Sequence, residues 1–370
     1  MRKIKALIVS QLPWSHSNRG IDILTEALTE IDEIEVHHLV FPHNFNFLTK
    51  VAENHPRIKQ LYAKKQYLFY YDKLMWWLPK SMTKLIIKHT INSAKNINFK
   101  DFDIIILESG NATLLKKLIT EDKILIYRQS DSMKELLNKN PVLWEVEDEV
   151  IERADLIFVV SKYFKSRIPE KHRNKTIIVV NGFNIPKKIS AISPFPKSSK
   201  NVVYLGYAPI DFGTVKFLVE NNPKVNFHII GRGLKPIEIL KLRKFHNFKH
   251  HGILNAQAYL PFMKYCDLFI VPYKESHLTK VTGLTSKYLL AMYFKKPIIS
   301  YPVGFMEEFK GLPVHFVKTK EEFDKELKRV LKEEKEVDYD IDFEYYSSEG
   351  RKREYKDSII KLLKEKRLLN

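Results

Sequence analysis

The chain has 370 residues, 44% of them apolar, which is enough for two domains with cores of their own. A net charge of +18 predicts an anionic partner, whether nucleic acid, a nucleotide sugar or an anionic membrane, although solvated surface lysines account for part of the excess. Cys266 is the only cysteine, which excludes an intramolecular disulfide and a cysteine-ligated zinc site and fits a reducing cytoplasm.

The apolar runs of the sequence are too short for membrane insertion. None reaches the roughly 20 apolar residues of a membrane span. Residues 3–11 form a strand-like run that Gln11 and Pro13 interrupt, so they lack the longer apolar core of a signal peptide. Any membrane contact is therefore expected to be peripheral.

The first half of the chain alternates short apolar runs with amphipathic, helix-like segments. Runs without polar alternation, separated by helices, indicate a parallel sheet that is covered on both faces. We expect residues 1–183 to form one doubly wound domain. Its predicted strands are 4–9, 36–41, 104–107, 124–127, 156–160 and 177–180.

Residues 184–200 carry three prolines with several serines and lysines, which is typical of an interdomain linker. The same architecture then repeats in a second domain, 201–344. The tail, 345–370, has the apolar spacing of a helix. The expected fold class is α/β, with two doubly wound, Rossmann-like domains. The predicted strands of the second domain are 202–205, 227–230, 268–271, 297–301 and 314–317.

The most informative stretch is 271–299, which predicts a strand end, a loop, a helix with Lys287 near its start, and another strand. In an open α/β sheet this order brings a cation and backbone N–H donors to the carboxyl ends of the strands, where phosphorylated ligands bind. The alternative is an ordinary lysine at a helix start, a position that the helix dipole disfavours. The stretch resembles the nucleotide-sugar site of GT-B glycosyltransferases, whose pattern KxxEYxAxGxPVV also places a lysine ten residues before the proline, here Pro297.

The resemblance extends over most of the chain. Residues 180–184 resemble the family's turn at the end of the first domain, and residues 251–273 resemble its glycine, short helix and strand ending in Pro-Tyr. It implies two domains facing a cleft, with the last helix crossing back to the first domain. The glycines that follow strands are equally expected in tight turns. The donor contacts implied by the resemblance are Lys287, Tyr273, Ser286, Gly206, Gly231, Arg232 and Ile253, the last beside the nucleobase.

Two departures from the family pattern indicate the subclass. Retaining members carry two glutamates around this helix, and the corresponding positions are Thr282 and Leu290, so we expect an inverting enzyme. The remaining pattern is similar to the membrane-associated bacterial glucuronosyltransferases of xanthan-type polysaccharide assembly. There a lysine neutralises the donor diphosphate, and a tyrosine lines the same site.

An inverting transfer needs a base for the acceptor hydroxyl. Asp131 follows the 124–127 strand, and the xanthan-type resemblance implies that it is this base, although Ser132 replaces the second acid of the family pair. Asp131 as the N-cap of a helix over 133–138 is the equal alternative. His16 is a rival base.

Further candidates in the first domain are Glu108, for the acceptor, and Arg19 and Arg128, for donor phosphate or an acidic acceptor. No paired acids lie in a loop suited to a metal ion. We therefore expect neither a metal nor another cofactor, with Lys287 and helix N-termini supplying the charge stabilisation.

Residues 57–100 mix lysines with aromatic residues, including Trp76 and Trp77. This composition fits an anionic bilayer, stacking on single-stranded nucleic acid, or helices packed on their own core. We prefer the bilayer and expect no nucleic-acid partner.

The expected function is an inverting, metal-independent transfer of a hexosyl or glucuronosyl group from a UDP-sugar. The expected acceptor is a lipid-linked glycan or another surface-polysaccharide precursor at the inner face of the cell membrane. The alternatives are a retaining relative with substituted glutamates, or a non-catalytic protein that binds nucleotides or nucleic acid.

Overall fold

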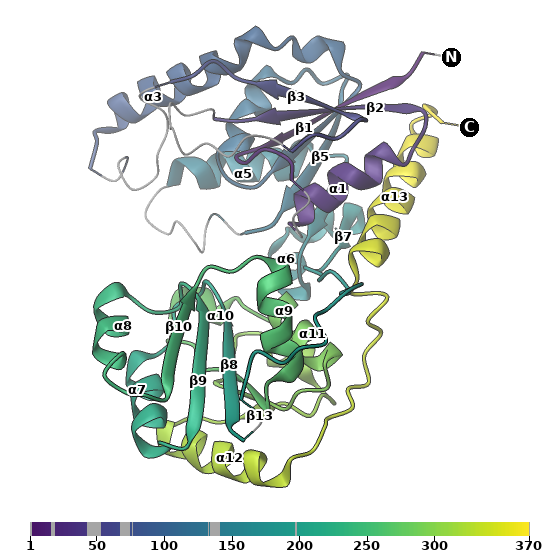
Figure 1. The fold of residues 1–370 in the computed structure, drawn as a ribbon. Helices are drawn as coiled ribbons and strands as arrows, with labels where there is room; N and C mark the ends of the chain where they lie inside the picture. Colours follow the sequence, from purple (N-terminus) through teal and green to yellow (C-terminus); the bar gives the residue numbers. More distant parts are fainter. Residues whose placement is uncertain are drawn as a thin grey trace. The chain divides into compact units, whose positions relative to one another are not determined.

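The computed structural model describes residues 2–15, 19–42, 53–66, 75, 77–131, 133, 141–196 and 198–369. The chain forms two compact units (Figure 1). The first unit comprises Met1–Asn181 and Ser348–Asn370, and the second comprises Gly182–Ser347. Each is built on a parallel sheet covered by helices, so the prediction of two doubly wound α/β sheets is confirmed.

The sheet of the first unit has seven parallel strands in the order β3-β2-β1-β4-β5-β6-β7. Its central strands are buried at almost every position, which explains why their sequences lack polar alternation. The edge strand β3 lies in a segment for which no strand was predicted. The strands are β1 (Ile4–Ser10), β2 (Ile34–Val40), β3 (Ile58–Tyr62), β4 (Ile104–Glu108), β5 (Ile124–Gln129), β6 (Leu156–Val159) and β7 (Thr176–Ile178).

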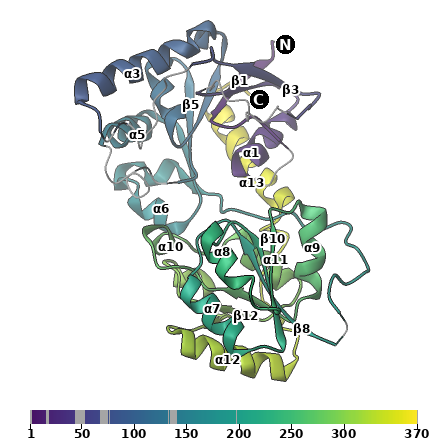
Figure 2. The same ribbon diagram turned by 60° about the vertical axis from the view of Figure 1, so that its left-hand side comes forward.

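Helices cover both faces of this sheet (Figures 1 and 2). One apolar core lies beneath α3, α5 and α6, and another lies beneath α1 and α13. Among the described residues, no helix combines the length and the apolar character needed to cross a bilayer. The helices are α1 (Gly20–Thr29), α3 (Lys80–Ser93), α5 (Pro141–Arg153), α6 (Lys162–Arg167) and α13 (Ser348–Glu365), with 3₁₀ segments at Ala94–Asn96, Phe99–Asp101, Asn111–Leu118 and Glu170–Lys175.

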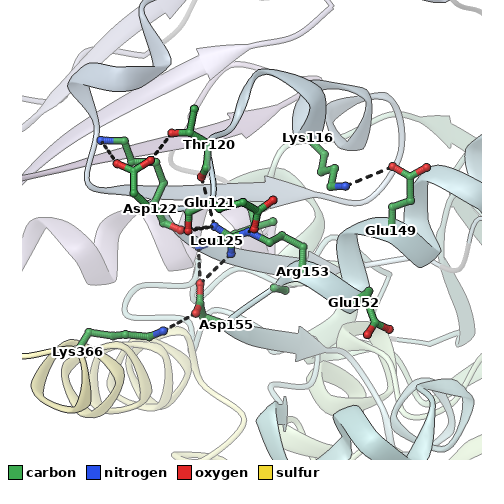
Figure 3. A network of polar contacts seen from close by, with 12 residues as sticks. Lys116, Thr120, Glu121, Asp122, Leu125, Glu149, Glu152, Arg153, Asp155 and Lys366 are labelled. Atoms are coloured by element: carbon green, nitrogen blue, oxygen red, sulfur yellow. Dashed lines mark hydrogen bonds and ion pairs between the residues drawn. The ribbon is translucent and has the colours of Figure 1, made fainter.

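The C-terminal helix α13 completes the first unit, although more than 160 residues separate it from the rest of that unit. Tyr355, Ile359 and Leu363 are at most 1% exposed and pack in the same core as α1. Burial of an apolar side chain of this size contributes about 1.5–3 kcal/mol. Beyond the helix, Lys366 pairs with Asp155 at 2.6 Å in a polar network at the edge of the sheet (Figure 3). Because Lys366 is half exposed, this ion pair contributes much less than the apolar contacts.

The second unit has six parallel strands in the order β10-β9-β8-β11-β12-β13. The connecting residues 184–200 run along this unit, where Phe195 is buried against Phe262. The strands are β8 (Lys200–Gly206), β9 (Val225–Gly231), β10 (Phe248–Gly252), β11 (Leu268–Val271), β12 (Ile298–Ser300) and β13 (His315–Phe316). The helices are α7 (Phe212–Asn221), α8 (Pro236–Leu242), α9 (Ala256–Tyr265), α10 (His277–Lys280), α11 (Ser286–Tyr293) and α12 (Lys320–Glu333), with a 3₁₀ segment at Met306–Phe309.

Each unit buries a histidine in its sheet. His38 on β2 is fully buried beside the Ser10 hydroxyl (3.2 Å), and His228 on β9 contacts the ring of His251 (Nδ1 to Nε2, 3.0 Å). Burial lowers the pKa of His38 to about 3 and that of His228 to about 3. Both rings are therefore neutral in the folded protein at pH values where an unfolded histidine is charged.

We expect the free energy of unfolding to fall as the pH drops from about 6.5, the ordinary histidine pKa, towards 3, because the unfolded state then binds more protons. One such histidine contributes up to about 1.4 kcal/mol for each pH unit in this window. Urea unfolding at a series of pH values measures the slope. His228→Gln should make it shallower, whereas His89→Gln, at an exposed position of α3, should leave it unchanged. Equal slopes for both variants would contradict this interpretation.

Candidate functional site

Each sheet reverses its strand order once, between β1 and β4 in the first unit and between β8 and β11 in the second. The crossovers of these neighbouring strands leave in opposite directions, which opens a crevice at their carboxyl ends, where α/β proteins bind ligands. In the second unit the loop after β8 returns across this position. Ile210 pairs with Tyr273 in an isolated bridge, and the Asp211 N–H donates to the Pro272 carbonyl at 2.7 Å.

Lys287 lies at this reversal, in the first turn of α11. Its Nζ is 5.2 Å from the ring centre of Tyr204 and 4.8 Å from that of Tyr273, so two aromatic faces flank the ammonium. It forms no ion pair with any residue that the structure describes. Burial lowers the pKa of Lys287 to about 7. The site therefore holds a cation with no anionic partner among the described residues.

Two of the predicted glycines adjoin this cation. The Lys287 ammonium lies so close to Gly206 that a side chain there would overlap it. Gly231 has a φ of +109° and packs against the Gly206 carbonyl, which also accepts the Arg232 N–H at 3.0 Å. The fold thus brings the predicted Lys287, Gly206, Gly231 and Arg232 together in the second unit.

Tyr204, one of the two rings that flank the Lys287 ammonium, was not among the residues predicted from the sequence. Tyr204 lies in the buried strand β8, and its hydroxyl donates to the Ala208 carbonyl at 2.7 Å. Burial raises the pKa of Tyr204 and of Tyr273, so both phenols are neutral at ordinary pH. Within an apolar run Tyr204 looked like a core residue. Only the phenolic hydroxyl of Tyr204, near the carboxyl end of a strand, could have indicated a ligand site.

The start of α11 provides further donors. Ser286 is exposed at the first helical position, after the N-cap residue Thr285. Thr285 lies near the Tyr273 hydroxyl but makes no well-formed hydrogen bond, so its Oγ1 is buried without a partner among the described residues. A hydroxyl and free backbone N–H groups at a helix N-terminus are suited to an anionic ligand.

A cavity of about 560 Å³ adjoins Tyr273 within the second unit. This volume falls within the range of small-molecule sites. Its wall is polar as well as aromatic, since Thr214 and Tyr301 share a hydrogen bond at 2.6 Å and the Asp211 carboxylate lies beside them. Hydroxyls, a carboxylate and aromatic rings can together bind a polyhydroxylated ring.

Ile253 is the remaining residue that was predicted to contact the nucleotide-sugar donor. Ile253 follows β10 and is 51% exposed. Of the two positions that carry glutamates in retaining enzymes, Leu290 is buried in the core and Thr282 lies in the loop before α11, so neither supplies a carboxylate.

In the first unit, Glu108 and Arg128 meet at the carboxyl ends of β4 and β5. The Arg128 side chain is 2% exposed, and its Nη1 donates to Glu108 Oε1 at 3.0 Å. Burial raises the pKa of Glu108, and the charge of Arg128 opposes this rise.

Asp131 lies in the loop after β5, and Ser109 orders that loop. The Ser109 hydroxyl accepts the backbone N–H groups of Ser130 (3.2 Å) and Asp131 (3.3 Å). Although Asp131 keeps much solvent exposure, nearby protein atoms raise the pKa of its carboxyl, against the charge of Arg128. Most of the helix that it was predicted to cap lies outside the described residues.

Arg19 and His16 are the other two residues of the first unit that were predicted to belong to the site. Arg19 stabilises the loop in which it lies, because its guanidinium contacts both carboxylate oxygens of Asp22 (2.6 and 2.7 Å) and the Pro13 carbonyl (2.6 Å). His16, the rival base, lies outside the described residues.

No protein-family model matches the sequence, and a search of curated proteins found no relative. Solved structures match almost the whole chain. Sucrose-phosphate synthase from Thermosynechococcus elongatus has a TM-score of 0.64 at 14% identity, covering 99% of this chain and 98% of its own. The chain has the GT-B fold. HepE from Anabaena, solved with UDP-glucose, gives 0.61 at 12% identity over 97% of this chain and 100% of its own.

A third match differs in its reaction. A putative UDP-N-acetylglucosamine 2-epimerase from Listeria monocytogenes gives a TM-score of 0.61 at 12% identity, covering 98% of this chain and 97% of its own. Proteins whose names indicate different reactions are therefore about equally similar to this chain. At such identities the likeness establishes the fold, and the reaction must be argued from the site.

We expect the affinity for UDP-glucose to fall as the pH rises through about 7, because Lys287 must be protonated to pair with a diphosphate. Below this pH the affinity should be constant, and above it the affinity should fall by up to about tenfold per pH unit. Lys287→Met should bind about 10- to 150-fold more weakly at pH 6, which corresponds to the roughly 1.5–3 kcal/mol of a charged hydrogen bond, and should lose the pH dependence.

Isothermal titration calorimetry at pH 6, 7 and 8 measures both effects. Lys241→Met, which removes an exposed lysine from α8 of the same unit, is the matched control and should behave like the wild type. A folded Lys287→Met protein with unchanged affinity would refute the diphosphate assignment.

Proposed function

We propose that this protein is a glycosyltransferase that moves a sugar from a UDP-sugar to a lipid-linked glycan or another precursor of a surface polysaccharide. The observation that carries the proposal is the Lys287 ammonium, which lies at the strand-order reversal of the second unit and pairs with no acidic residue in the part of the chain that the structure describes. The HepE structure with UDP-glucose supports a nucleotide-sugar donor for this fold.

In this proposal Lys287 binds the donor diphosphate. Negative charge grows on the β-phosphate as the bond to the sugar breaks, and a cation fixed in a low-dielectric site stabilises that charge. The N-terminus of α11, with Ser286 and the Thr285 hydroxyl, provides further donors. Because Lys287 supplies the positive charge, we propose a transfer that needs no metal. The sugar ring occupies the adjoining cavity beside Tyr301.

The first unit supplies the base. Asp131 takes the proton of the acceptor hydroxyl as its oxygen bonds to the anomeric carbon, the bond from that carbon to the diphosphate breaks, and UDP leaves. This single displacement inverts the configuration of the anomeric carbon. Glu108 and Asp131 form the acidic edge of the first unit. The positive charge of Arg128 offsets part of their negative charge, and Glu108 contacts the acceptor. The resemblance to xanthan-type enzymes supports a hexose or a hexuronic acid as the sugar.

A second candidate is epimerisation of the nucleotide sugar itself, which the similarity to the Listeria protein favours. Incubation with UDP-sugars and no acceptor distinguishes the two reactions, because an epimerase converts its donor unaided whereas a transferase requires an acceptor for transfer. A retaining transferase would give the opposite anomer of the product, and a non-catalytic nucleotide-binding protein would give no product.

We also propose that α3 brings the protein to an anionic membrane at the inner face of the cell. Trp77, just before the helix, is 85% exposed, and Leu85 is 67% exposed. Lys80, Lys84 and Lys88 are exposed around them and form no ion pair with a described residue. Exposed apolar groups among unpaired cations are typical of a helix that lies in the interface of anionic lipid.

The base assignment predicts that Asp131→Asn retains the affinity for UDP-glucose, since the donor binds to the other unit, but loses about 10²–10⁴-fold in turnover. Steady-state transfer kinetics and donor titration measure the two quantities on one sample. A residue that merely caps a helix would tolerate the change, because asparagine caps about as well as aspartate. Near-normal turnover of Asp131→Asn, combined with loss of activity in folded His16→Ala, would transfer the role to His16.

The membrane proposal predicts cosedimentation with vesicles of phosphatidylcholine and phosphatidylglycerol, weakening as salt rises, and little binding to phosphatidylcholine alone. The double variant Trp77→Ser, Leu85→Ser should bind several-fold more weakly. The double variant Ile237→Ser, Leu240→Ser removes similarly exposed apolar side chains from α8 and should bind like the wild type. Equal binding to both vesicle types would contradict the proposal.

A further inference from the structure

Tyr355 links the C-terminal helix to the acidic edge of the first unit. It lies on α13, is 1% exposed and packs edge-on against Phe158 with ring centres 4.8 Å apart. Its hydroxyl oxygen accepts a hydrogen bond from Arg128 Nε at 3.0 Å, although the two residues are 227 positions apart in the sequence. A purely apolar residue would fill the same core position without this bond.

Arg128 is held from three sides. Its Nε donates to Tyr355 on α13, and its Nη1 donates to Glu108 on β4. On the third side the guanidinium lies against Gly20 at the start of α1, where any side chain would overlap it. A buried guanidinium is costly unless its donors are paired, so these partners fix its place in the fold.

The position of Arg128 matters for two carboxyl groups. Its charge favours the ionised forms of Glu108, which burial disfavours, and of Asp131, which nearby protein atoms disfavour. Among the described residues, the other charged groups near Glu108 are Asp22 of α1 and Arg19, which immediately precedes that helix, and these two pair with each other. Arg128 is therefore the cation among these groups that contacts the acidic edge directly.

We propose that Tyr355 is a positioning residue for the transfer reaction, because its hydroxyl holds Arg128 against Glu108 and near Asp131. The acidic edge of the first unit is then complete only when α13 is docked. This inference rests on the proposed function in one respect, namely that the base belongs to this edge.

The test is Tyr355→Phe, which keeps the ring against Phe158 and removes the acceptor of Arg128 Nε. The Nε donor is then buried without this acceptor, so the guanidinium should shift towards water and weaken its contact with Glu108. The pKa of the base should then rise, so the acid limb of kcat/KM should move up by roughly one pH unit. At any pH on the acid limb, turnover should fall by up to about tenfold and should recover at high pH, while the affinity for UDP-glucose should not change.

Tyr339→Phe is the matched control. Tyr339 is a buried tyrosine of the second unit whose hydroxyl donates to the Lys296 carbonyl at 2.8 Å. Its removal should lower the melting temperature without moving the acid limb. If Tyr355→Phe only lowers the melting temperature in the same way, Tyr355 is structural and the proposal is overturned.

A second measurement does not depend on transfer activity. Titration of the unliganded protein, followed by ¹³C NMR of labelled carboxyl groups and assigned with Glu108→Gln and Asp131→Asn, gives both pKa values directly. Tyr355→Phe should raise both relative to the wild type, and unchanged values would refute the positioning role. A wild-type protein that transfers no sugar would instead refute the proposed function, with the titration still deciding the role of Tyr355.

Discussion

In a parallel sheet, the chain can pass from one strand to the next only through a crossover segment that starts at the carboxyl end of the first strand. This constraint places the main candidate residues at the carboxyl ends of the strands. Where two neighbouring crossovers diverge, side chains from distant segments meet at one sheet edge. In the second unit, the divergence of β8 and β11 brings Gly206 and Tyr273 to the same point as Lys287. In the first unit, Glu108 ends β4 and Arg128 is the last residue but one of β5, beside the start of α1. The chemistry of each edge follows from which residues occupy these ends.

The buried cations at the carboxyl-end edges of the two sheets differ in their partners. Arg128 has a carboxylate and a phenol as partners, so its burial is compensated within the first unit. Among the residues that the structure describes, Lys287 has no anionic partner and lies against the faces of two tyrosine rings, which stabilise a cation much less than a carboxylate does. A buried cation without an anionic partner lowers the stability of the folded protein, and residues that carry such a cost are typical of ligand sites rather than of structural cores. The two buried cations therefore differ in whether a described residue gives them an anionic partner.

The sequence predicted what depends on local pattern. Continuous apolar runs such as 104–107 and 268–271 are strands because both faces of each sheet are covered, and the spacing of Lys287 from Pro297 placed that lysine at a helix start. What depends on tertiary contact was not predictable. Tyr204 and Tyr355 look like core aromatics until their hydroxyl partners are known, and nothing local pairs position 128 with position 355. The edge strand β3 escaped prediction because half-exposed strands have weak patterns.

The return of α13 to the first unit also affects the order in which the chain can fold as it is made. Domains generally fold as units during synthesis, starting from the N-terminus. Here the first unit cannot be completed until residues 348–370 have been synthesised, because Ile359 and Leu363 cover the apolar side of α1. The second unit is contiguous and can reach its final packing earlier. The apolar side of α1 that these residues cover therefore stays uncovered while the second unit is being synthesised.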